Sequence, residues 1–263
     1  MKTVHDFARA KAEHRRISIV TAYDAWSARL VARSSVDAIL VGDSVAMVVH
    51  GHDTTIPATV GMMALHVRAV VRAAGGKFVI GDLPFLSYRR GIPAAISAVS
   101  ALVRSGAQAV KLEGVDGHED VIRQIVGSGV PVMGHIGMTP QSVNHMGGFR
   151  VQGTNEADAS ALVRQALTLE HLGCFSIVLE CVPATLAARI RSELTIPTIG
   201  IGAGPDNDGQ VLVLQDLWGV DQTHTPRFVR RYVDGERILT AALDEYDADV
   251  KEARFPVLQE SYR

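Results

Sequence analysis

Short apolar runs recur along the whole chain, and this periodicity limits its fold more than any other feature. Such runs occur roughly every 20 to 40 residues, at 17–21, 38–41, 78–81, 109–112, 130–134, 176–179, 197–201 and 211–214. Continuous apolar runs of this length are typical of strands buried on both faces of a parallel sheet. Helical patterns lie between most of them, so the sequence favours a (β/α)8 TIM barrel. A doubly wound open sheet is the alternative, because alternation alone does not reveal closure. The last run could instead begin a helix.

Several boundaries of the intervening segments can be predicted. Gly75-Gly76 should end a helix that runs from about 60 to 74. The D-x-x-E spacing of 116–119 predicts a capping box that opens the next helix. Residues 136–155, rich in Gly, Asn and Gln, form the longest irregular stretch, and a loop of this length is more often functional than a default connection.

The chain of 263 residues, 47% hydrophobic, is predicted to form one barrel domain over 1–263. Residues 1–16 are expected to hold a short amphipathic helix, with Val4, Phe7, Ala8 and Lys11 at helical spacing, rather than a signal segment. Residues from about 233 to 263 are expected to form a C-terminal helix and tail.

Charge and cysteine content exclude several classes of function. Lys plus Arg (26) nearly balances Asp plus Glu (28), so no basic field indicates nucleic acid or an anionic membrane as a partner. The longest apolar stretches, about ten residues, are well short of the ~20 that span a bilayer. Cys174 and Cys181 fit neither a redox pair nor a zinc site, and a reducing cytoplasm is the simplest compartment.

Polar residues at the ends of predicted strands are the best indication of chemistry. They are Asp43, Asp82, Lys111, Glu113, His135 and Glu180. In a barrel these residues would converge on the C-terminal mouth, where the active site of this fold lies. Lys111 and Glu113 are two positions apart, so their side chains leave the same face of one strand.

Each residue alone has a plainer interpretation. Asp43 could simply cap the next helix, whereas Asp82 precedes Leu83-Pro84, where a helix is less favoured. Lys111 is expensive to bury unless an anion pairs with it, and Glu113 could supply a purely structural pair. A structural pair does not explain why consecutive strands end in acids or bases, so the cluster favours a site.

Carboxylates on adjacent strands suit a hard divalent cation such as Mg²⁺. Zinc is disfavoured because no set of His and Cys converges, and His50 and His52 are expected to hydrogen-bond within their own polar turn. Gly200–Gly204 could bind phosphate through backbone N–H groups, or could be a tight turn where backbones pack closely.

The same residues predict metal-assisted enolisation or C–C bond formation on an α-keto acid. Lys111 could neutralise the substrate carboxylate or the developing oxyanion, and His135 could donate a hydrogen bond to the substrate. Glu180 would be free to act as the general base. This chemistry alone does not name a substrate.

The sequence resembles the ketopantoate hydroxymethyltransferase family from about 17 to 232. The resemblance rests on motifs that occur in order at 21–24, 40–44, 51–57, 82–85, 110–114, 134–142, 178–183, 199–204 and 208–210. It implies a barrel that uses Mg²⁺ and transfers a one-carbon unit from 5,10-methylenetetrahydrofolate to 3-methyl-2-oxobutanoate, giving 2-dehydropantoate. It also implies a homo-oligomer, often a decamer.

The family's functional residues match positions of this chain. The resemblance implies that Asp43, Asp82 and Glu113 are associated with the metal, and that Glu180 is the proton acceptor. It further implies that Asp43, Ser44, Asp82 and Lys111 contact the keto acid.

Some positions depart from the family pattern. Ala46, Gln215 and Trp218 stand where other residues are common, and they could alter the folate side of the pocket or the oligomer contact. Two other functions remain open. One is a Mg²⁺-dependent C–C lyase or phosphonomutase of the isocitrate-lyase type, although the loop 136–155 lacks the cysteine seen in such lyases. The other is a barrel that only binds a small anion or acts as a scaffold.

Overall fold

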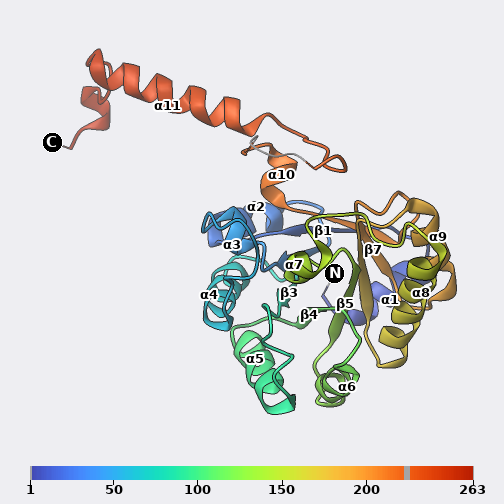
Figure 1. Ribbon diagram of the computed structural model, residues 1–263. Helices are drawn as coiled ribbons and strands as arrows, with labels where there is room; N and C mark the ends of the chain where they lie inside the picture. Colours follow the sequence, from blue (N-terminus) through green and yellow to red (C-terminus); the bar gives the residue numbers. More distant parts are fainter. Residues whose placement is uncertain (1, 222–225, 263) are drawn as a thin grey trace. The chain divides into compact units, whose positions relative to one another are not determined.

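The computed structural model describes residues 2–221 and 226–262 (Figure 1). It divides into two compact units, Met1–Leu212 and Val213–Arg263. All the strands belong to the first unit, and the organisation of the chain as one domain stays a prediction.

Eight parallel strands close into a barrel in the order of the sequence (Figure 1). They are β1 Ile17–Thr21, β2 Ala38–Val41, β3 Phe78–Asp82, β4 Ala109–Glu113, β5 Val132–Gly137, β6 Ser176–Glu180, β7 Thr198–Ile201 and β8 Gly209–Leu212. β1 pairs with β2 on one side and with β8 on the other, which closes the sheet. The predicted TIM barrel is therefore confirmed, and the open sheet is excluded.

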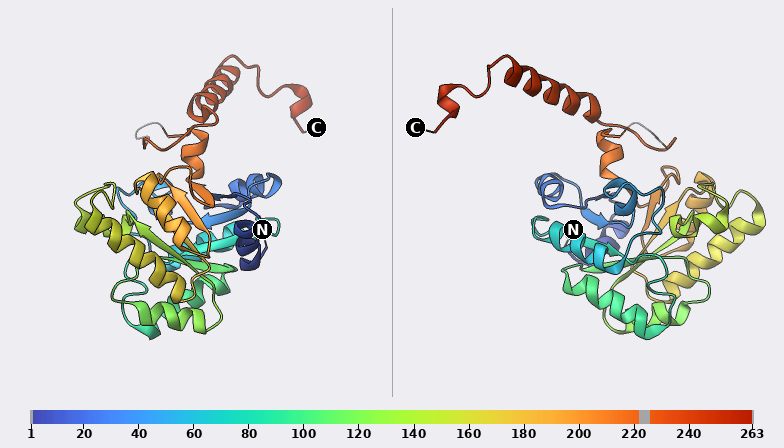
Figure 2. Two further views of the ribbon diagram at one scale, coloured as in Figure 1. Left: turned by 90° about the vertical axis from the view of Figure 1, so that its right-hand side faces the viewer. Right: turned by 60° about the vertical axis from the view of Figure 1, so that its left-hand side comes forward.

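Helices surround the sheet in both views of Figure 2. They are α1 Val4–Ala12, α2 Ala25–Arg33, α3 Val45–Val48, α4 Val60–Val71, α5 Ile92–Arg104, α6 Glu119–Gly127, α7 Val143–Met146, α8 Glu156–His171 and α9 Ala184–Glu193. Polar caps begin several of them: the side chains of Asp24, Thr59 and Asn155 each accept a hydrogen bond from a backbone N–H in the first turn. Such caps satisfy donors that have no partner within the helix.

Helix α1 packs against the barrel at the end opposite the polar residues. Phe7 is fully buried and meets Phe78 and Phe175 edge to face, at centroid distances of 5.4 and 5.2 Å. The helix predicted within 1–16 is thus confirmed, but Ala10 is buried and Ala8 is exposed. Lys11 Nζ lies 3.1 Å from Asp208 Oδ2, which fixes the helix to the start of β8.

Two boundary predictions are wrong. β8 ends at Leu212, because Leu214 begins helix α10 instead of closing the strand. The capping box predicted at 116–119 does not form, since the Asp116 carboxylate accepts a hydrogen bond from Gln165 Nε2 at 2.6 Å. His118 stands at the N-cap of α6 without a side-chain cap.

The connection from β7 to β8 contains no helix, so it departs from the expected alternation. Gly204 adopts φ +75°, and a Cβ there would lie 2.4 Å from Ala184 Cβ. Asn207 Nδ2 donates to the carbonyls of Ala203 and Gly204 at 3.1 and 3.2 Å. These contacts support the interpretation of Gly200–Gly204 as a tight turn where backbones approach closely.

The stretch 136–155 is less irregular than predicted. β5 extends to Gly137, the 3₁₀ helix η1 spans Pro140–Ser142, and the single-turn helix α7 follows it directly. Residues 147–155 have no regular structure. The first half of this stretch therefore has a defined backbone that can hold side chains in place.

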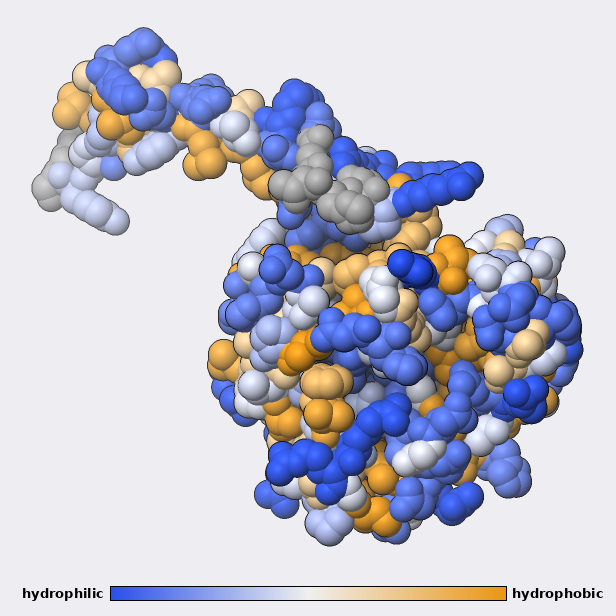
Figure 3. Space-filling view, in the orientation of Figure 1, coloured by the Kyte–Doolittle hydropathy of each residue, from blue (hydrophilic) through white to orange (hydrophobic). Residues whose placement is uncertain are grey.

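The second unit contains α10 Leu214–Trp218, α11 Gly235–Lys251 and the 3₁₀ helix η2 Leu258–Glu260. Helix α11 falls within the predicted C-terminal helix and tail. Ile238, Leu239, Leu243, Tyr246 and Val250 on this helix are all exposed, and apolar side chains are visible along it in Figure 3. Among the residues that the structure describes, no helix is both long enough and apolar enough to cross a membrane.

Candidate active site

The polar residues predicted at the strand ends lie together at the C-terminal mouth of the barrel. Lys111 Nζ is 2.7 Å from Asp82 Oδ2 and 3.4 Å from His135 Nδ1. His135 Nδ1 is 3.4 Å from Glu113 Oε1, and its Nε2 is 3.1 Å from Glu180 Oε2. Each residue in this chain of contacts comes from β3, β4, β5 or β6, so neighbouring strands build one continuous site.

Strand register explains why these side chains meet. Asp82 pairs with Lys111 across β3 and β4, and Glu113 pairs with His135 across β4 and β5. Paired positions on adjacent parallel strands direct their side chains to the same face of the sheet. The spacing of two between Lys111 and Glu113 then places all four side chains inside the barrel.

Asp43 and Ser44 follow β2 and complete one side of the mouth. The Asp43 backbone N–H donates to Asp82 Oδ2 at 3.3 Å, and its side chain is buried. Ser44 Oγ lies 2.8 Å from the hydroxyl of Tyr23. A Cβ on Gly42 would lie 2.8 Å from Ser44 Oγ, so only glycine leaves this serine in its place. Asp43 does not cap α3, whose N-cap is Ser44.

Lys111 carries a stable charge although it is buried. Burial lowers the pKa of its ammonium, but Asp82, Glu113 and Asp43 outweigh this effect and raise the pKa above its usual value. The ammonium therefore remains protonated at neutral pH. The plain interpretation, a structural pair with Glu113, is wrong in detail, because the direct partner is Asp82.

The buried carboxyl groups of Asp43 and Asp82 have raised pKa values, so their charged forms are disfavoured. Burial and the neighbouring charges of Asp82 and Glu113 raise the pKa of Asp43 well above its usual range. Burial also raises the pKa of Asp82, although Lys111 opposes it. A bound cation would relieve this crowding of negative charge.

The available oxygens of these carboxylates fit a divalent cation. Asp82 Oδ1 and Glu113 Oε1 are buried and accept no aligned hydrogen bond. Among the described residues, no three His, Cys, Asp or Glu side chains are close enough together to enclose a metal ion. Mg²⁺ is commonly held by one or two carboxylates and several waters, so it does not require three protein side chains around it.

His135 lies between two acids. Burial and the Lys111 ammonium lower its pKa, but the contacts with Glu113 and Glu180 raise the pKa of His135 to about 9 overall. The contact of Nε2 with Glu180 is close but is not an aligned hydrogen bond, since Nε2 has no partner of suitable geometry. Glu180 is 17% exposed, more than any other acid in the cluster that lies on a strand, so it can reach an incoming molecule.

Two further residues of the site were missed in the sequence. Gln141 and Tyr88 are buried, and the Tyr88 hydroxyl lies 3.0 Å from Gln141 Oε1. Gln141 Nε2 donates to Asp43 Oδ2 at 2.8 Å. Two signals could have indicated Gln141: its position in a long loop directly after a strand end, and its place within the family motif at 134–142.

Other candidates lie outside this cluster. His50 Nε2 is 3.0 Å from His66 Nε2 on α4, so its side chain contacts a helix and the prediction of a hydrogen bond within its own turn is wrong. His52 is exposed. Ala46 is fully buried in α3, while Gln215 and Trp218 belong to α10 of the second unit.

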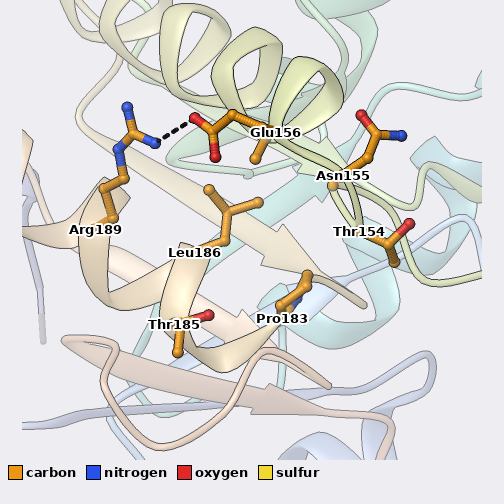
Figure 4. Close-up of a pocket in the computed structure, with 9 residues that line it drawn as sticks. Thr154, Asn155, Glu156, Pro183, Thr185, Leu186 and Arg189 are labelled. Atoms are coloured by element: carbon orange, nitrogen blue, oxygen red, sulfur yellow. Dashed lines mark hydrogen bonds and ion pairs between the residues drawn. The ribbon is translucent and has the colours of Figure 1, made fainter.

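A cavity of about 320 Å³ lies between the N-terminal ends of α8 and α9 (Figure 4). Thr154, Asn155 and Pro183 line it, and Leu186 points into it from α9. Arg189 on its rim pairs with Glu156 at 3.3 Å (Figure 4). The Asn155 side chain accepts from the Asp158 N–H, so it caps α8.

Comparison with known proteins identifies the family. A family profile described as Ketopantoate hydroxymethyltransferase matches residues 1–257. The chain belongs to the ketopantoate hydroxymethyltransferase family. Its relatives in this family include the 3-methyl-2-oxobutanoate hydroxymethyltransferase of Bdellovibrio bacteriovorus, 53% identical over 262 residues and covering 100% of both chains. The protein of the same name from Legionella pneumophila is 49% identical and covers 98% of this chain and 99% of its own.

Solved structures outside the ketopantoate hydroxymethyltransferase family share the barrel fold. A phosphonopyruvate hydrolase in complex with oxalate and Mg²⁺ matches with a TM-score of 0.65 at 12% identity, covering 99% of this chain and 93% of its own. A 2,3-dimethylmalate lyase, a member of the PEP mutase/isocitrate lyase superfamily, matches with a TM-score of 0.60 at 17% identity, covering 100% and 92%. At these identities the likeness shows the fold alone.

Proposed function

We propose that this protein transfers a hydroxymethyl group from 5,10-methylenetetrahydrofolate to 3-methyl-2-oxobutanoate and so forms 2-dehydropantoate, a step of pantothenate and coenzyme A synthesis. Full-length relatives at about 50% identity carry the name of this enzyme. The observation that carries the proposal is the cluster at the barrel mouth, in which a buried ammonium and three carboxylates lie beside a partly exposed acid. This arrangement suits the removal of a proton next to a carbonyl group.

Mg²⁺ is the proposed cofactor, associated with Asp43, Asp82 and Glu113 either directly or through bound water. The carboxylate oxygens without an aligned hydrogen-bond donor support this assignment. When bound, the ion would polarise the keto group and make the C3 proton of the substrate more acidic. All other steps are assigned to side chains of the protein.

Lys111 and Ser44 are proposed to bind the substrate together with Asp43 and Asp82. The Lys111 ammonium is charged and fixed by Asp82, so it can pair with the substrate carboxylate without rearrangement. The Ser44 hydroxyl, oriented by Tyr23, can donate to a second substrate oxygen. Both groups are in place before the substrate arrives, which reduces the entropic cost of binding.

Glu180 is proposed to accept the C3 proton. His135 Nε2 lies 3.1 Å from Glu180 Oε2, so a protonated imidazole attracts the carboxylate toward the interior of the mouth. His135 can also donate to the substrate once Glu180 turns toward C3. Glu180 ends β6, which lies opposite β2 and Asp43 in the eight-stranded barrel. The substrate proton would therefore be accepted away from the crowded carboxylates.

Isotope exchange tests this proposal without the folate donor. The full chain is incubated with 3-methyl-2-oxobutanoate in D₂O, with Mg²⁺ or with EDTA, and the C3 proton is followed by NMR. We expect Mg²⁺-dependent exchange, and a loss of about 10²–10⁴-fold in Glu180→Gln, the usual range for a general base. Glu193→Gln, which alters an exposed helical pair with Arg189, should exchange at the normal rate. Normal exchange in Glu180→Gln would disprove the base assignment.

The donor distinguishes the transferase from a lyase or phosphonomutase of the same fold. A lyase would also exchange the proton but would not consume 5,10-methylenetetrahydrofolate. We expect the folate to be consumed in step with the formation of 2-dehydropantoate.

Homo-oligomerisation, as a decamer by family resemblance, is part of the same proposal. The apolar face of α11 supports it, because an exposed stripe of this kind usually covers a partner surface. Multi-angle light scattering of the full chain, with Leu243→Glu as the variant, measures the assembly. A cytoplasmic location is also proposed, and the free thiols of Cys174 and Cys181 agree with a reducing compartment.

A further inference from the structure

Each of the three carboxylates proposed to hold Mg²⁺ has one oxygen bound by a donor of the chain. Asp82 Oδ2 receives the Lys111 ammonium at 2.7 Å. Asp43 Oδ2 receives Gln141 Nε2 at 2.8 Å, and Glu113 Oε2 receives the Gln141 backbone N–H at 3.0 Å. A single residue therefore binds two of the three acids, on opposite sides of Asp82.

The remaining contacts of Gln141 fix the orientation of its amide. Nε2 also donates to the Leu83 carbonyl at 2.9 Å, and Oε1 accepts from the Tyr88 hydroxyl at 3.0 Å. Tyr88 is in turn bound to the backbone of Glu113, whose N–H donates to the hydroxyl at 3.2 Å. With both of its neighbours defined, the amide cannot flip without losing several buried hydrogen bonds.

We propose that Gln141 is a positioning residue that sets the carboxylates of Asp43 and Glu113 for the cation. By engaging one oxygen of each acid, it turns the other oxygen toward the site, as it does for Glu113 Oε1, which has no aligned donor. Outer groups of this kind orient metal ligands and typically contribute 10–100-fold to metal affinity. The inference rests on the proposed Mg²⁺ site.

The placement of Gln141 also gives the 3₁₀ helix η1 a role. Pro140 begins η1, and the Ser142 N–H donates to the Thr139 carbonyl at 2.8 Å, which closes the turn. This short turn carries the Gln141 backbone N–H to Glu113 and its side chain to Asp43, on strand ends far apart in the sequence. The segment after β5 thus connects Glu113 on β4 with Asp43 after β2.

Titration of the full chain with MgCl₂, in the absence of both substrates, tests the inference by calorimetry. Gln141→Met keeps the length of the side chain but removes the amide. Tyr88→Phe removes only the hydroxyl that orients the amide. Gln152→Met is the matched control, because Gln152 lies in the same loop and its side-chain Nε2 donates to the Arg150 carbonyl rather than to an acid of the site. Melting temperatures are measured in EDTA to separate binding from folding.

We expect Gln141→Met to weaken Mg²⁺ binding about 10–100-fold. Tyr88→Phe should weaken it by a smaller factor, about 3–10-fold, because it removes the hydroxyl beside the amide and leaves the Gln141 contacts with both acids in place. Gln152→Met should match the wild type. A lower melting temperature in EDTA with unchanged Mg²⁺ affinity in both variants would show a structural role and overturn the inference. If the wild type itself binds no Mg²⁺, the proposed cofactor fails and this inference fails with it. If Gln141→Met does not fold, Tyr88→Phe alone decides: wild-type affinity would refute the positioning role.

Discussion

Replacing Lys111 by Met should destabilise the protein far more than the loss of any surface ion pair. At a separation of 2.7 Å and an effective dielectric constant of about 20, the attraction between Lys111 and Asp82 is about 6 kcal/mol. Part of this attraction offsets the cost of burying the ammonium, so it is not the net effect. Removing one partner of a buried pair typically costs about 3–5 kcal/mol, because a charge is left without compensation. We expect a loss of this size in the free energy of unfolding at pH 7.5.

The pH dependence of this loss has a definite sign. Burial already raises the pKa of Asp82 in the presence of Lys111, and removing the ammonium raises it further. A carboxyl group whose pKa is higher in the folded state favours folding in its protonated form, so its penalty falls as the pH drops through the folded pKa. The difference between wild type and Lys111→Met should therefore be smaller at pH 5.5 than at pH 7.5.

Guanidinium chloride unfolding in EDTA, followed by circular dichroism, measures both values. Arg189→Met is the control, since its pairs with Glu156 and Glu193 are exposed to solvent and should contribute little to stability. A loss in Lys111→Met as small as that in the control would refute the argument that the buried pair stabilises the mouth. A large loss that does not change with pH would refute the role assigned to Asp82.

Three further predictions concern Asp82, Asp208 and Phe7. Asp82→Asn should weaken Mg²⁺ binding at least tenfold in a calorimetric titration, and unchanged affinity would exclude Asp82 as a ligand. Thr198, Arg191 and Lys11 outweigh burial and lower the pKa of Asp208, so its contribution to stability is present above about pH 4 and is lost as the pH falls through the folded pKa. Asp208→Asn should therefore melt below the wild type at pH 7, and the gap should close near pH 3; a constant gap contradicts this. Phe7→Ala should cost about 3–5 kcal/mol of unfolding free energy, as for other buried aromatic residues, and a loss under 1 kcal/mol would show that α1 does not seal the barrel.

Strands were the most predictable part of this fold. β1 and β2 have the predicted bounds, because continuous apolar runs with abrupt polar ends carry a strong local signal. β8 was displaced by two residues, since its run continues into the first apolar residues of α10. Asp116 shows a different limit: its side chain is engaged by Gln165 on α8, and local spacing cannot reveal a competing partner from another helix.

The residues of the candidate site could be predicted from the sequence, but not their contacts. The acids and bases at the strand ends could be grouped from sequence, because a barrel brings the C-terminal ends of its strands together. Their pairing could not, since Lys111 contacts Asp82 rather than Glu113 as a result of strand register. The role of Gln141 is harder still to predict from the sequence, because it depends on the 3₁₀ helix η1, which no periodic pattern indicates.

The acids at the barrel mouth outnumber the bases, and this excess of negative charge supports the proposed cofactor. Four acids stand against one ammonium and one imidazole at this site: Asp43, Asp82, Glu113 and Glu180 against Lys111 and His135. With the imidazole protonated, as its raised pKa favours, the group still has two formal negative charges in excess. The protein alone can relieve this excess only by holding protons, which is the direction in which the pKa values of Asp43 and Asp82 move. A divalent cation would cancel it and would lower both pKa values. The acids whose crowding is unfavourable for the protein alone are thus the groups that a bound Mg²⁺ would stabilise, and Glu180, on the far side of His135, would remain available to accept a proton.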